Sequence, residues 1–331
     1  MTDSPPRVGA VVLARDRAGP TAKTLEALLA QEPAPDRLVL VDNDGTLEVR
    51  ALLEDAAARH PEAEVLRLSH NLGSAGGFQR GLERLLEQAD IDLACGFDDD
   101  ATPLPGCLAA LTRAATSFPG VGAVGAISHD PAGTLAWPMP IAGTRELVRT
   151  LADIDAIAGR RALLPVPNLA WHGAMFPAEV LRRHGTVWGD LFLQYEDIEL
   201  GFRLRRAGLH SYLVPEARCL HPAPPRARSV RIMGRRIDVT AQSPAKEYLT
   251  LRNGLVVRHR HEGLRFWYGT GPLVLLRGLL SALALAVPKR SALRHVFARG
   301  IVDALSGRLG PPPRATAELG SCPAQEGPGP G

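Results

Sequence analysis

The chain has 331 residues, of which 45% are hydrophobic and 22% charged, and this composition excludes a collagen-like or wholly disordered protein. The length allows one large domain or two modest ones with a hydrophobic core. From Arg226 onward, 17 Lys and Arg stand against 6 Asp and Glu, a net charge of +11, whereas the preceding part has a net charge of −8. This asymmetry favours an anionic surface or substrate at the C-terminal end, with a solvated basic face as the alternative.

The cysteines and the N-terminus are those of a cytoplasmic protein. The four cysteines are scattered without metal-ligand spacing, which is typical of reduced thiols: Cys95, Cys107, Cys219 and Cys322. The N-terminus lacks the basic start and apolar core of a signal peptide. We therefore expect a cytoplasmic location.

Over the first 130 residues, apolar runs typical of buried strands alternate with helical patterns. Strands are predicted over 7–16, 36–44, 63–71, 91–100 and 121–128, and helices over 21–31, 47–60, 76–89 and 105–117. Such alternation with short turns predicts an α/β fold, in which helices cover both faces of a parallel sheet. Ligands of these sheets bind beyond the carboxyl ends of the strands, so polar residues there are candidate site residues.

Three aspartates in "FDDDA" end the fourth predicted strand. Because side chains alternate along a strand, Asp98 and Asp100 are expected on one face and Asp99 on the other. Two carboxylates facing a crevice suit Mg²⁺ or Mn²⁺, and such an ion bridges the diphosphate of a nucleotide. The alternative is an acidic turn whose aspartates cap the next helix.

Two further segments follow predicted strands. In "VDNDG", Asp42 either accepts hydrogen bonds from a nucleobase or ribose or makes a local Asx turn. In "HNLGSAGGFQRG", the glycines between a strand and a helix allow backbone to approach an anionic ligand at the helix N-terminus. Their position and spacing differ from the dinucleotide fingerprint, which argues against a nicotinamide dehydrogenase.

After a less regular stretch over 129–167, an amphipathic helix is predicted within "YEDIELGFRLRRAG". Its first turn holds Glu196 and Asp197, which either stabilise the helix dipole or supply a general base. His221 ends the next predicted strand. With two aspartates already proposed, its neutral imidazole is a candidate to complete a metal site.

The C-terminal part is predicted to contain a basic mobile loop over 223–243, helices over 244–308 and a disordered tail over 309–331. Residues 271–287 are apolar except for Arg277. This segment is short for a membrane-spanning helix, and an arginine near its middle would be costly in hydrocarbon. Two alternatives remain open. The helix lies in a membrane interface, with Arg277, Lys289 and Arg290 reaching head groups, or it packs on the domain core or on a second subunit.

Taken in chain order, these motifs resemble the inverting glycosyltransferases of family 2, which have the GT-A fold. The segments that carry the resemblance are "VVLARDR", "VDNDG", "HNLGSAGGFQRG", "FDDDA", "YEDIELGFRLRRAG" and "CLHP". Bacterial galactofuranosyltransferases and rhamnosyltransferases are the most similar subgroup. The resemblance implies a Rossmann-like mixed sheet flanked by helices, with residues 1–222 as the catalytic domain and a helical segment after it.

The resemblance also implies roles for individual residues. Asp197 is the catalytic base, which deprotonates an acceptor hydroxyl that attacks the anomeric carbon with inversion. Asp98, Asp100 and His221 hold Mn²⁺ or Mg²⁺. The sugar nucleotide is bound by Asp42, Asn71, Gly73, Gly76, Asp98 and Asp99. The acceptor side is formed by Trp171, His172 and Glu196, with Trp171 either stacking on a sugar or packing in the core.

The implied partners follow from the same subgroup. The donor is UDP-galactofuranose or dTDP-rhamnose, and the acceptor is a glycan or a polyprenyl-diphosphate-linked glycolipid used in cell-envelope polysaccharide synthesis. The basic loop is expected to close over the diphosphate or to face a membrane-bound acceptor through Arg226, Arg228, Arg231, Arg235 and Arg236. "KEYLTLRNGL" resembles a Tyr…Arg-Asn segment of the subgroup, so Tyr248, Arg252 and Asn253 are expected to border the site.

Two other functions remain as alternatives. A nucleotidyltransferase needs a glycine-rich, basic loop after the first strand, but "ARDRAGPTAK" has one glycine and one lysine there. The second alternative is a non-catalytic sugar-nucleotide or lipid-binding module that has kept the fold, which replacement of Asp197 by Asn would distinguish from an enzyme. Nucleic-acid binding is not expected, because the aromatic fraction is 5% and the basic residues lack aromatic interleaving.

Overall fold

The computed structural model describes residues 4–141, 147–159, 161–222, 228–232, 235–239, 242–285 and 287–320. The chain divides into two compact units. The first consists of Met1–Gly189 and Glu196–Pro224, and the second of Asp190–Tyr195 and Pro225–Gly331. The short segment Asp190–Tyr195 therefore groups with the C-terminal part of the chain, although it lies inside the predicted catalytic domain.

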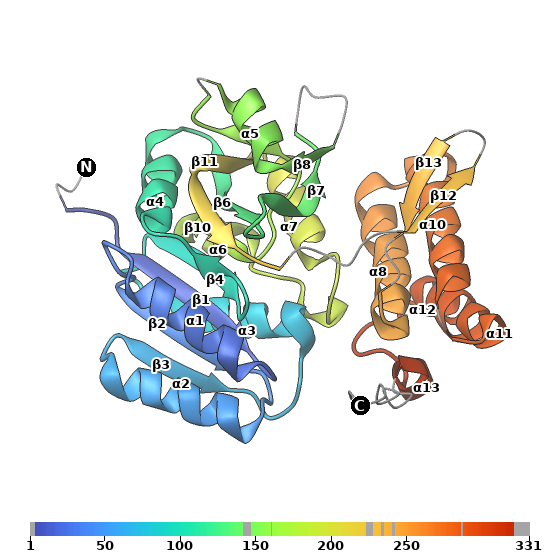
Figure 1. The fold of residues 1–331 in the computed structure, drawn as a ribbon, viewed down its shortest axis with the longest axis horizontal. Helices are drawn as coiled ribbons and strands as arrows, with labels where there is room; N and C mark the ends of the chain where they lie inside the picture. Colours follow the sequence, from blue (N-terminus) through green and yellow to red (C-terminus); the bar gives the residue numbers. More distant parts are fainter. Residues whose placement is uncertain are drawn as a thin grey trace, which may run out of the picture. The chain divides into compact units, whose positions relative to one another are not determined.

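The first unit is built on one mixed sheet with helices packed against it (Figure 1). Its strands are β1 (Val8–Ala14), β2 (Arg37–Asp42), β3 (Ala63–Arg67), β4 (Leu93–Asp98), β5 (Thr102–Pro103), β6 (Val121–His129), β7 (Thr134–Met139), β8 (Val148–Thr150), β9 (Leu164–Val166), β10 (His172–Pro177) and β11 (His210–Leu220). Its helices are α1 (Ala18–Leu29), α2 (Leu47–Arg59), α3 (Gly73–Leu86), α4 (Cys107–Ser117), α5 (Leu151–Ala158), α6 (Ala178–His184) and α7 (Glu196–Arg206).

The strand order makes the sheet mixed rather than parallel. Strands β3, β2, β1 and β4 lie side by side in parallel. Strand β10 then runs antiparallel between β4 and β6, and β11 pairs in parallel with β6. The edge strand β5 pairs antiparallel with β11. The alternation of strands and helices over the first 130 residues thus indicates the parallel half correctly, and β10 makes the whole sheet mixed, as the family resemblance implies.

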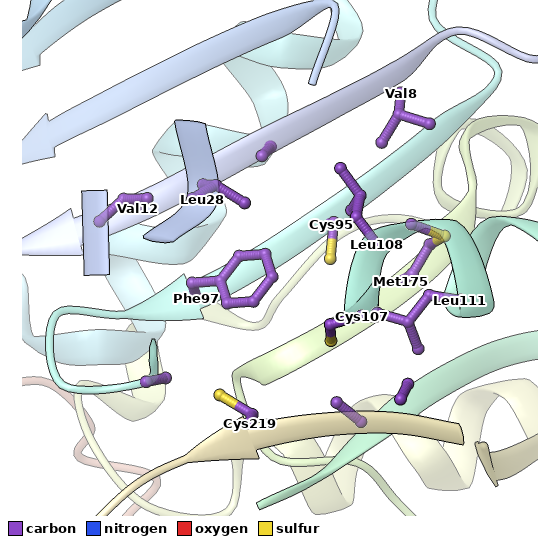
Figure 2. Close-up of a cluster of buried hydrophobic side chains, with 14 of the residues drawn as sticks. Val8, Val12, Leu28, Cys95, Phe97, Cys107, Leu108, Leu111, Met175 and Cys219 are labelled. Atoms are coloured by element: carbon purple, nitrogen blue, oxygen red, sulfur yellow. The ribbon is translucent and has the colours of Figure 1, made fainter. Parts of the chain in front are cut away.

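Strand β1 is buried on both faces, which explains its continuous apolar sequence. On one face, Val8, Ala10 and Val12 join a core cluster with residues of α1, α2 and α4. Figure 2 labels Val8, Val12 and Leu28 of α1 in this cluster. On the other face, α3 lies very close to the strand. A Cβ atom added at Gly77 would be 2.4 Å from a methyl carbon of Leu13. The glycines of α3 therefore serve helix–sheet packing as well as any ligand.

The cysteines lie in the same core, as Figure 2 shows. Cys95, Cys107 and Cys219 are buried and unpaired, and burial raises the pKa of the Cys107 thiol to about 12. They behave as small apolar side chains, which agrees with the expectation of reduced thiols. Cys322 lies outside the described residues.

The direction of the strands decides which residues meet at the edge of the sheet. The carboxyl ends of β2 and β4 are at Asp42 and Asp98, and the register places Leu13 of β1 beside Asp98. Because β10 is antiparallel to β4, its first residue, His172, pairs with Phe97. At the end of β11, the His221 amide donates to the His129 carbonyl at 3.0 Å. His172 and His221 therefore lie at the same edge of the sheet as Asp42 and Asp98, the edge formed by the carboxyl ends of the parallel strands.

The second unit is mainly helical. Its elements are α8 (Pro244–Glu262), α9 (Arg265–Tyr268), α10 (Thr270–Ala284), α11 (Lys289–Ala292), η2 (Leu293–Ala298), α12 (Arg299–Leu305), α13 (Arg314–Ala317) and η3 (Glu318–Gly320), with a hairpin of β12 (Arg228–Ile232) and β13 (Arg235–Val239). The 3-10 helix η1 (Gly189–Leu191) lies where the chain passes from the first unit into the second. In the part of the chain that the structure describes, no helix is both long and apolar enough to cross a bilayer.

Two expectations for this part need correction. The basic stretch predicted as a mobile loop contains the β12–β13 hairpin, because β-branched residues alternate in "SVRI" and "RIDV". Arg226 and the rest of residues 223–227, 233–234 and 240–241 lie outside the described residues. The tail predicted to be disordered from residue 309 contains α13 and η3 up to Gly320, and residues 321–331 are not described.

The Tyr…Arg-Asn residues of α8 are in the interior of the second unit. Tyr248 is 1% exposed, and Arg252 and Asn253 are 0% exposed. Tyr248 donates a 2.7 Å hydrogen bond to Asp303 of α12, and Arg252 donates to the backbone of Leu191 at 3.1 Å. The expectation that these three side chains border a binding site is therefore wrong, since all of them are used in internal packing.

Candidate active site

The aspartate motif lies at the end of β4, as expected, but its side chains are arranged differently. The strand ends at Asp98, and the Ala101 amide closes a turn on the Asp98 carbonyl at 3.1 Å. Strand alternation therefore stops at Asp98, and the guanidinium of Arg17 contacts both Asp99 and Asp100. The prediction that Asp99 points away from Asp100 is wrong for this reason.

Two stacked imidazoles face the aspartates. The rings of His172 and His221 are 3.9 Å apart between centroids. His172 Nε2 lies 3.7 Å from Asp98 Oδ2, and His221 Nε2 lies 3.4 Å from Asp100 Oδ1. The structure thus brings Asp98, Asp100 and His221 together, and it adds His172, which we had assigned to the acceptor side.

The tautomer of His221 follows from its second contact. His221 Nδ1 is 2.7 Å from the Pro222 carbonyl oxygen, which can only accept a hydrogen bond. Nδ1 therefore carries hydrogen. When Nε2 also carries one, the ring donates to the Asp100 carboxylate, and in the neutral ring the Nε2 lone pair points at that carboxylate. A lone pair and a carboxylate oxygen facing each other form an arrangement that a cation would stabilise.

The pKa directions describe a site with an excess of negative charge. Burial, followed by repulsion from Asp100 and Asp99, raises the pKa of Asp98 well above its usual range. Burial also raises the pKa of Asp99. For Asp100, burial works in the same direction, but His221 and Arg17 outweigh it and lower its pKa. Burial lowers the pKa of His172 to about 3, so its ring is neutral at physiological pH.

The donor set fits a divalent cation in chemistry, although its atoms are not gathered around one point. Over the described ranges, no three His, Cys, Asp or Glu side chains form a ready metal site. The carboxylate oxygens nevertheless suit Mn²⁺ and Mg²⁺, and His221 adds one imidazole nitrogen beside them. The candidate ligands are Asp98, Asp100 and His221, with His172 beside them.

The two acids at the start of α7 have different surroundings. Asp197 is half-buried, and its carboxylate accepts hydrogen bonds from Asn168 Nδ2 and from the Ile198 amide, both at 2.8 Å. Burial raises the pKa of Asp197, and these two donors act against the rise. Glu196 is buried, and the Ser74 hydroxyl donates to it at 2.5 Å. Asp197 is therefore the more accessible of the two acids.

The expected nucleotide-binding residues are at the same edge of the sheet. Asp42 is fully buried, its Oδ1 accepts from the Gly45 amide at 2.7 Å, and its Oδ2 lies 3.1 Å from Arg50 Nε and 3.2 Å from Arg67 Nε. Asp42 thus makes the Asx turn that we considered as the alternative to base recognition. Its contact with a nucleotide stays a prediction.

The glycine-rich segment begins α3 directly. Gly73 is the first residue of the helix and has a φ of 70°, in the left-handed region that favours glycine. Its amide donates to the Asn71 side chain at 2.8 Å, and Asn43 donates to the Gly73 carbonyl at 3.0 Å. A Cβ atom at Gly76 would be 2.6 Å from that of Leu72. The positions of Asn71, Gly73 and Gly76 are thus set by the turn into the helix.

Trp171 is in the core, so an acceptor sugar has no ring face on which to stack. The indole stacks on Phe78 at a centroid distance of 4.3 Å, and it also lies against Gly96. Only 4% of Trp171 is exposed. The structure supports the core-packing alternative. Glycine at position 96 is required, because a Cβ atom there would lie 2.7 Å from the indole.

Sequence comparisons identify relatives over most of the chain. A family profile described as glycosyltransferase like family 2 matches residues 5–239. Galactofuranosyltransferase GlfT1 of Mycobacterium tuberculosis is 32% identical over 263 residues, which cover 76% of this chain and 81% of the relative. The protein of the same name from Mycolicibacterium smegmatis is 29% identical, covering 79% and 89%. N-acetylglucosaminyl-diphospho-decaprenol L-rhamnosyltransferase of M. tuberculosis is 30% identical, covering 60% and 70%.

Structural comparison identifies proteins with the same fold at low sequence identity. GalNAc-T7 with UDP, GalNAc and Mn²⁺ has a TM-score of 0.57 and 13% identity, over 82% of this chain and 52% of that one, so this chain spans about half its length. The mannosyltransferase PcManGT from Pyrobaculum calidifontis, in complex with GDP-Man and Mn²⁺, has a TM-score of 0.55 and 17% identity, covering 96% and 86%. At these identities the likeness shows the fold alone.

Proposed function

Since the chain belongs to the glycosyltransferase like family 2 and has the GT-A fold, we propose that it is a metal-dependent, inverting transferase of galactofuranose or rhamnose. Its enzyme class and its relation to mycobacterial galactofuranosyl and rhamnosyl transferases follow from the comparisons. The single observation that carries the rest is the meeting of Asp98, Asp100, His172 and His221 at one edge of the sheet.

The proposed chemistry assigns distinct tasks to the acids. Asp98, Asp100 and His221 would hold the metal, which when bound stabilises the negative charge of the leaving nucleoside diphosphate. Asp197 accepts the proton of the acceptor hydroxyl. The hydroxyl oxygen forms a bond to the anomeric carbon of the donor sugar, and the bond between that carbon and the phosphate oxygen breaks. Asn168 holds the Asp197 carboxylate in a fixed orientation.

The relatives support a choice of donor and acceptor. The galactofuranosyltransferases match a larger share of the chain than the rhamnosyltransferase does, so we place UDP-galactofuranose before dTDP-rhamnose. The name of the rhamnosyltransferase includes N-acetylglucosaminyl-diphospho-decaprenol, a sugar linked to a polyprenyl diphosphate. A polyprenyl-diphosphate-linked glycan is accordingly the proposed acceptor class, in cell-envelope polysaccharide synthesis.

Donor hydrolysis tests the proposed reaction. The purified protein with Mn²⁺ or Mg²⁺ is incubated with a panel of sugar nucleotides, and released UDP or dTDP is measured. One donor should be consumed by the wild type, and D197N should bind that donor while losing transfer to an acceptor. D55N is the matched control, because Asp55 is an exposed acid on α2 paired with Arg59. Equal transfer by D197N and wild type would contradict the role of Asp197.

We also propose a peripheral location on the inner face of the membrane, through the α9–α10 corner. Apolar and aromatic side chains are exposed there, with Leu264 at 78% and Tyr268 at 77%, beside Trp267 and Leu273. Such residues favour the membrane interface, and Arg265 and Arg277 are exposed close to them in the sequence. The buried face of α10 packs against α8, so deletion of residues 271–290 would disturb the fold.

Point substitutions therefore test this location better than a deletion. The combined variant W267S/Y268S/L273S should lose most flotation with liposomes that contain anionic lipid. L47S, which changes an exposed leucine of α2 that is 80% accessible, should float like the wild type. Unchanged flotation of the triple variant would contradict the membrane proposal, whereas the proposal of transferase activity would still stand.

A further inference from the structure

We infer that Arg17 competes with the divalent cation for Asp100 and, by pairing with Asp99, keeps that aspartate out of the metal site. This inference rests on the proposed metal site and adds a residue that the aspartate motif does not include. Arg17 would be a positioning residue for the motif, rather than a group that touches the reacting atoms.

Arg17 makes a forked contact across the two aspartates. Its Nε lies 3.3 Å from Asp99 Oδ2, its Nη2 contacts Asp99 Oδ1, and its Nη1 contacts Asp100 Oδ2. The flat guanidinium presents several donors in fixed directions, which a lysine ammonium cannot do. Arg17 is therefore bound by both oxygens of Asp99 and by one oxygen of Asp100.

Helix α1 holds both partners of this contact. Arg17 directly precedes the helix, and the amide and hydroxyl of Thr21 donate to the Arg17 carbonyl at 3.0 and 2.7 Å. The buried hydroxyl of Thr24 donates to the Asp99 carbonyl at 3.1 Å. The backbone at each end of the ion pair is thus fixed by the same helix, so the contact is part of the fold.

The two aspartates differ in what remains free. Both oxygens of Asp99 are engaged by Arg17, and its side chain is 8% exposed. Asp100 keeps Oδ1 directed to His221 Nε2, at 3.4 Å. Asp100 is therefore shared between the guanidinium on one side and the imidazole of the proposed metal site on the other, whereas Asp99 belongs to Arg17.

Charge gives the sign of the competition. A divalent cation bound between Asp100 and His221 would be repelled by the guanidinium next to the same carboxylate. Without Arg17, the carboxylates of Asp98–Asp100 would no longer have its positive charge next to them. Both effects strengthen cation binding, so removal of Arg17 should tighten it by about tenfold, given the strength of such charge interactions at short range.

The test is Mn²⁺ binding to the full chain without nucleotide, followed by electron paramagnetic resonance of free Mn²⁺. R17Q should lower the Kd for Mn²⁺ by about tenfold. R17K should fall between R17Q and the wild type, since lysine restores the charge without the fork. R15Q is the matched control, because Arg15 is two residues away, exposed and paired with Asp16 at 3.0 Å. It makes the same change in net charge and should leave the Kd within about twofold.

Two results would overturn the inference. An unchanged or higher Kd for R17Q means that Arg17 does not compete with the cation, and a Kd of R15Q equal to that of R17Q means that net charge alone is responsible. D100N separates this failure from failure of the metal site: if D100N binds Mn²⁺ like the wild type, the proposed site itself is wrong, whatever R17Q does. Should R17Q fold poorly, the same comparison is made with R17K, whose Kd must then lie below that of the wild type.

Discussion

Two side chains to which the sequence motifs give no role donate hydrogen bonds to the acids at the start of α7. Asn168 donates to Asp197, and Ser74 donates to Glu196. Both donors come from segments distant in the sequence, 29 and 122 residues away from their partners. The sequence predicts which acids begin the helix, but only the fold shows that each one has its own hydrogen-bond donor.

If Asp197 is the base, as proposed, Asn168 should influence the pH at which it acts. The amide stabilises the ionised carboxylate, so N168A should raise the pKa of Asp197 further above its usual value. Asp197 must be ionised to accept a proton, and activity falls as the pH drops through its pKa. The acid limb of the kcat/KM profile should therefore move to higher pH in N168A. In S74A, which removes the donor to Glu196, the limb should stay in place.

The charge of Asp98 should cost stability when the proposed metal ligands have no cation. Burial and repulsion by Asp99 and Asp100 disfavour its ionised form. D98N should therefore raise the Tm of the metal-free protein by about 2 to 4 °C, which corresponds to about 1 kcal/mol for a domain of this size. Differential scanning fluorimetry with and without Mn²⁺ checks this. D98N should also lose the stabilisation by Mn²⁺, and a lower Tm without metal would contradict the prediction.

At the scale of elements, strand β10 decides which side chains enter the site. Periodicity locates the strands and helices of the first 130 residues within a few residues of their observed bounds. It does not give the order of strands, because pairing between β10 and β4 joins residues about 80 positions apart. That pairing brings His172 beside Asp98 and buries Trp171 on Gly96. Sequence alone leaves open whether Trp171 stacks on a sugar or packs in the core, because the answer depends on this pairing.

Because α3 packs closely on β1, a side chain added at a glycine of α3 should strongly reduce the stability of the first unit. A side chain at Gly77 would meet Leu13 at 2.4 Å. G77V should destabilise the first unit by about 1 to 3 kcal/mol in urea unfolding. G19A is the control, because a Cβ added at Gly19 of α1 would meet no atom within 4 Å outside its chain neighbours and the adjoining helix backbone. It should change stability by less than about 0.5 kcal/mol or increase it slightly. Equal effects of both would show that α3 does not pack closely on β1.

At the scale of the whole molecule, the chain enters the second unit twice. Residues 190–195 are held there by Asn253, whose Nδ2 lies 2.9 Å from the carbonyl oxygens of Leu191, Leu193 and Gln194. Phe192, Gln194 and Tyr195 have φ values of 67°, 72° and 73°, in the left-handed region that is unfavourable for such residues. The hydrogen bonds of Asn253 offset this strain. The Arg-Asn pair is a recognisable motif, but its sequence does not show that it binds backbone within the protein.

Asn253 should therefore matter for stability more than its neighbours on α8. N253A leaves buried carbonyl groups without their donor and should destabilise the second unit by about 2 to 3 kcal/mol. K246A, which changes an exposed residue of the same helix, should have an effect below about 0.5 kcal/mol. Urea unfolding and limited proteolysis of the full chain distinguish the two variants. Similar stability of N253A and K246A would mean that the segment does not depend on this amide.

The excursion of residues 190–195 also limits how relatives can be recombined. A gene shortened after Pro224 would still encode the whole sheet and every acid proposed to take part in transfer. Its product would lack the two side chains of α8 that hold the six residues directly before Glu196. A hybrid that takes its C-terminal half from another family member therefore needs two exchanges, the half itself and this hexapeptide.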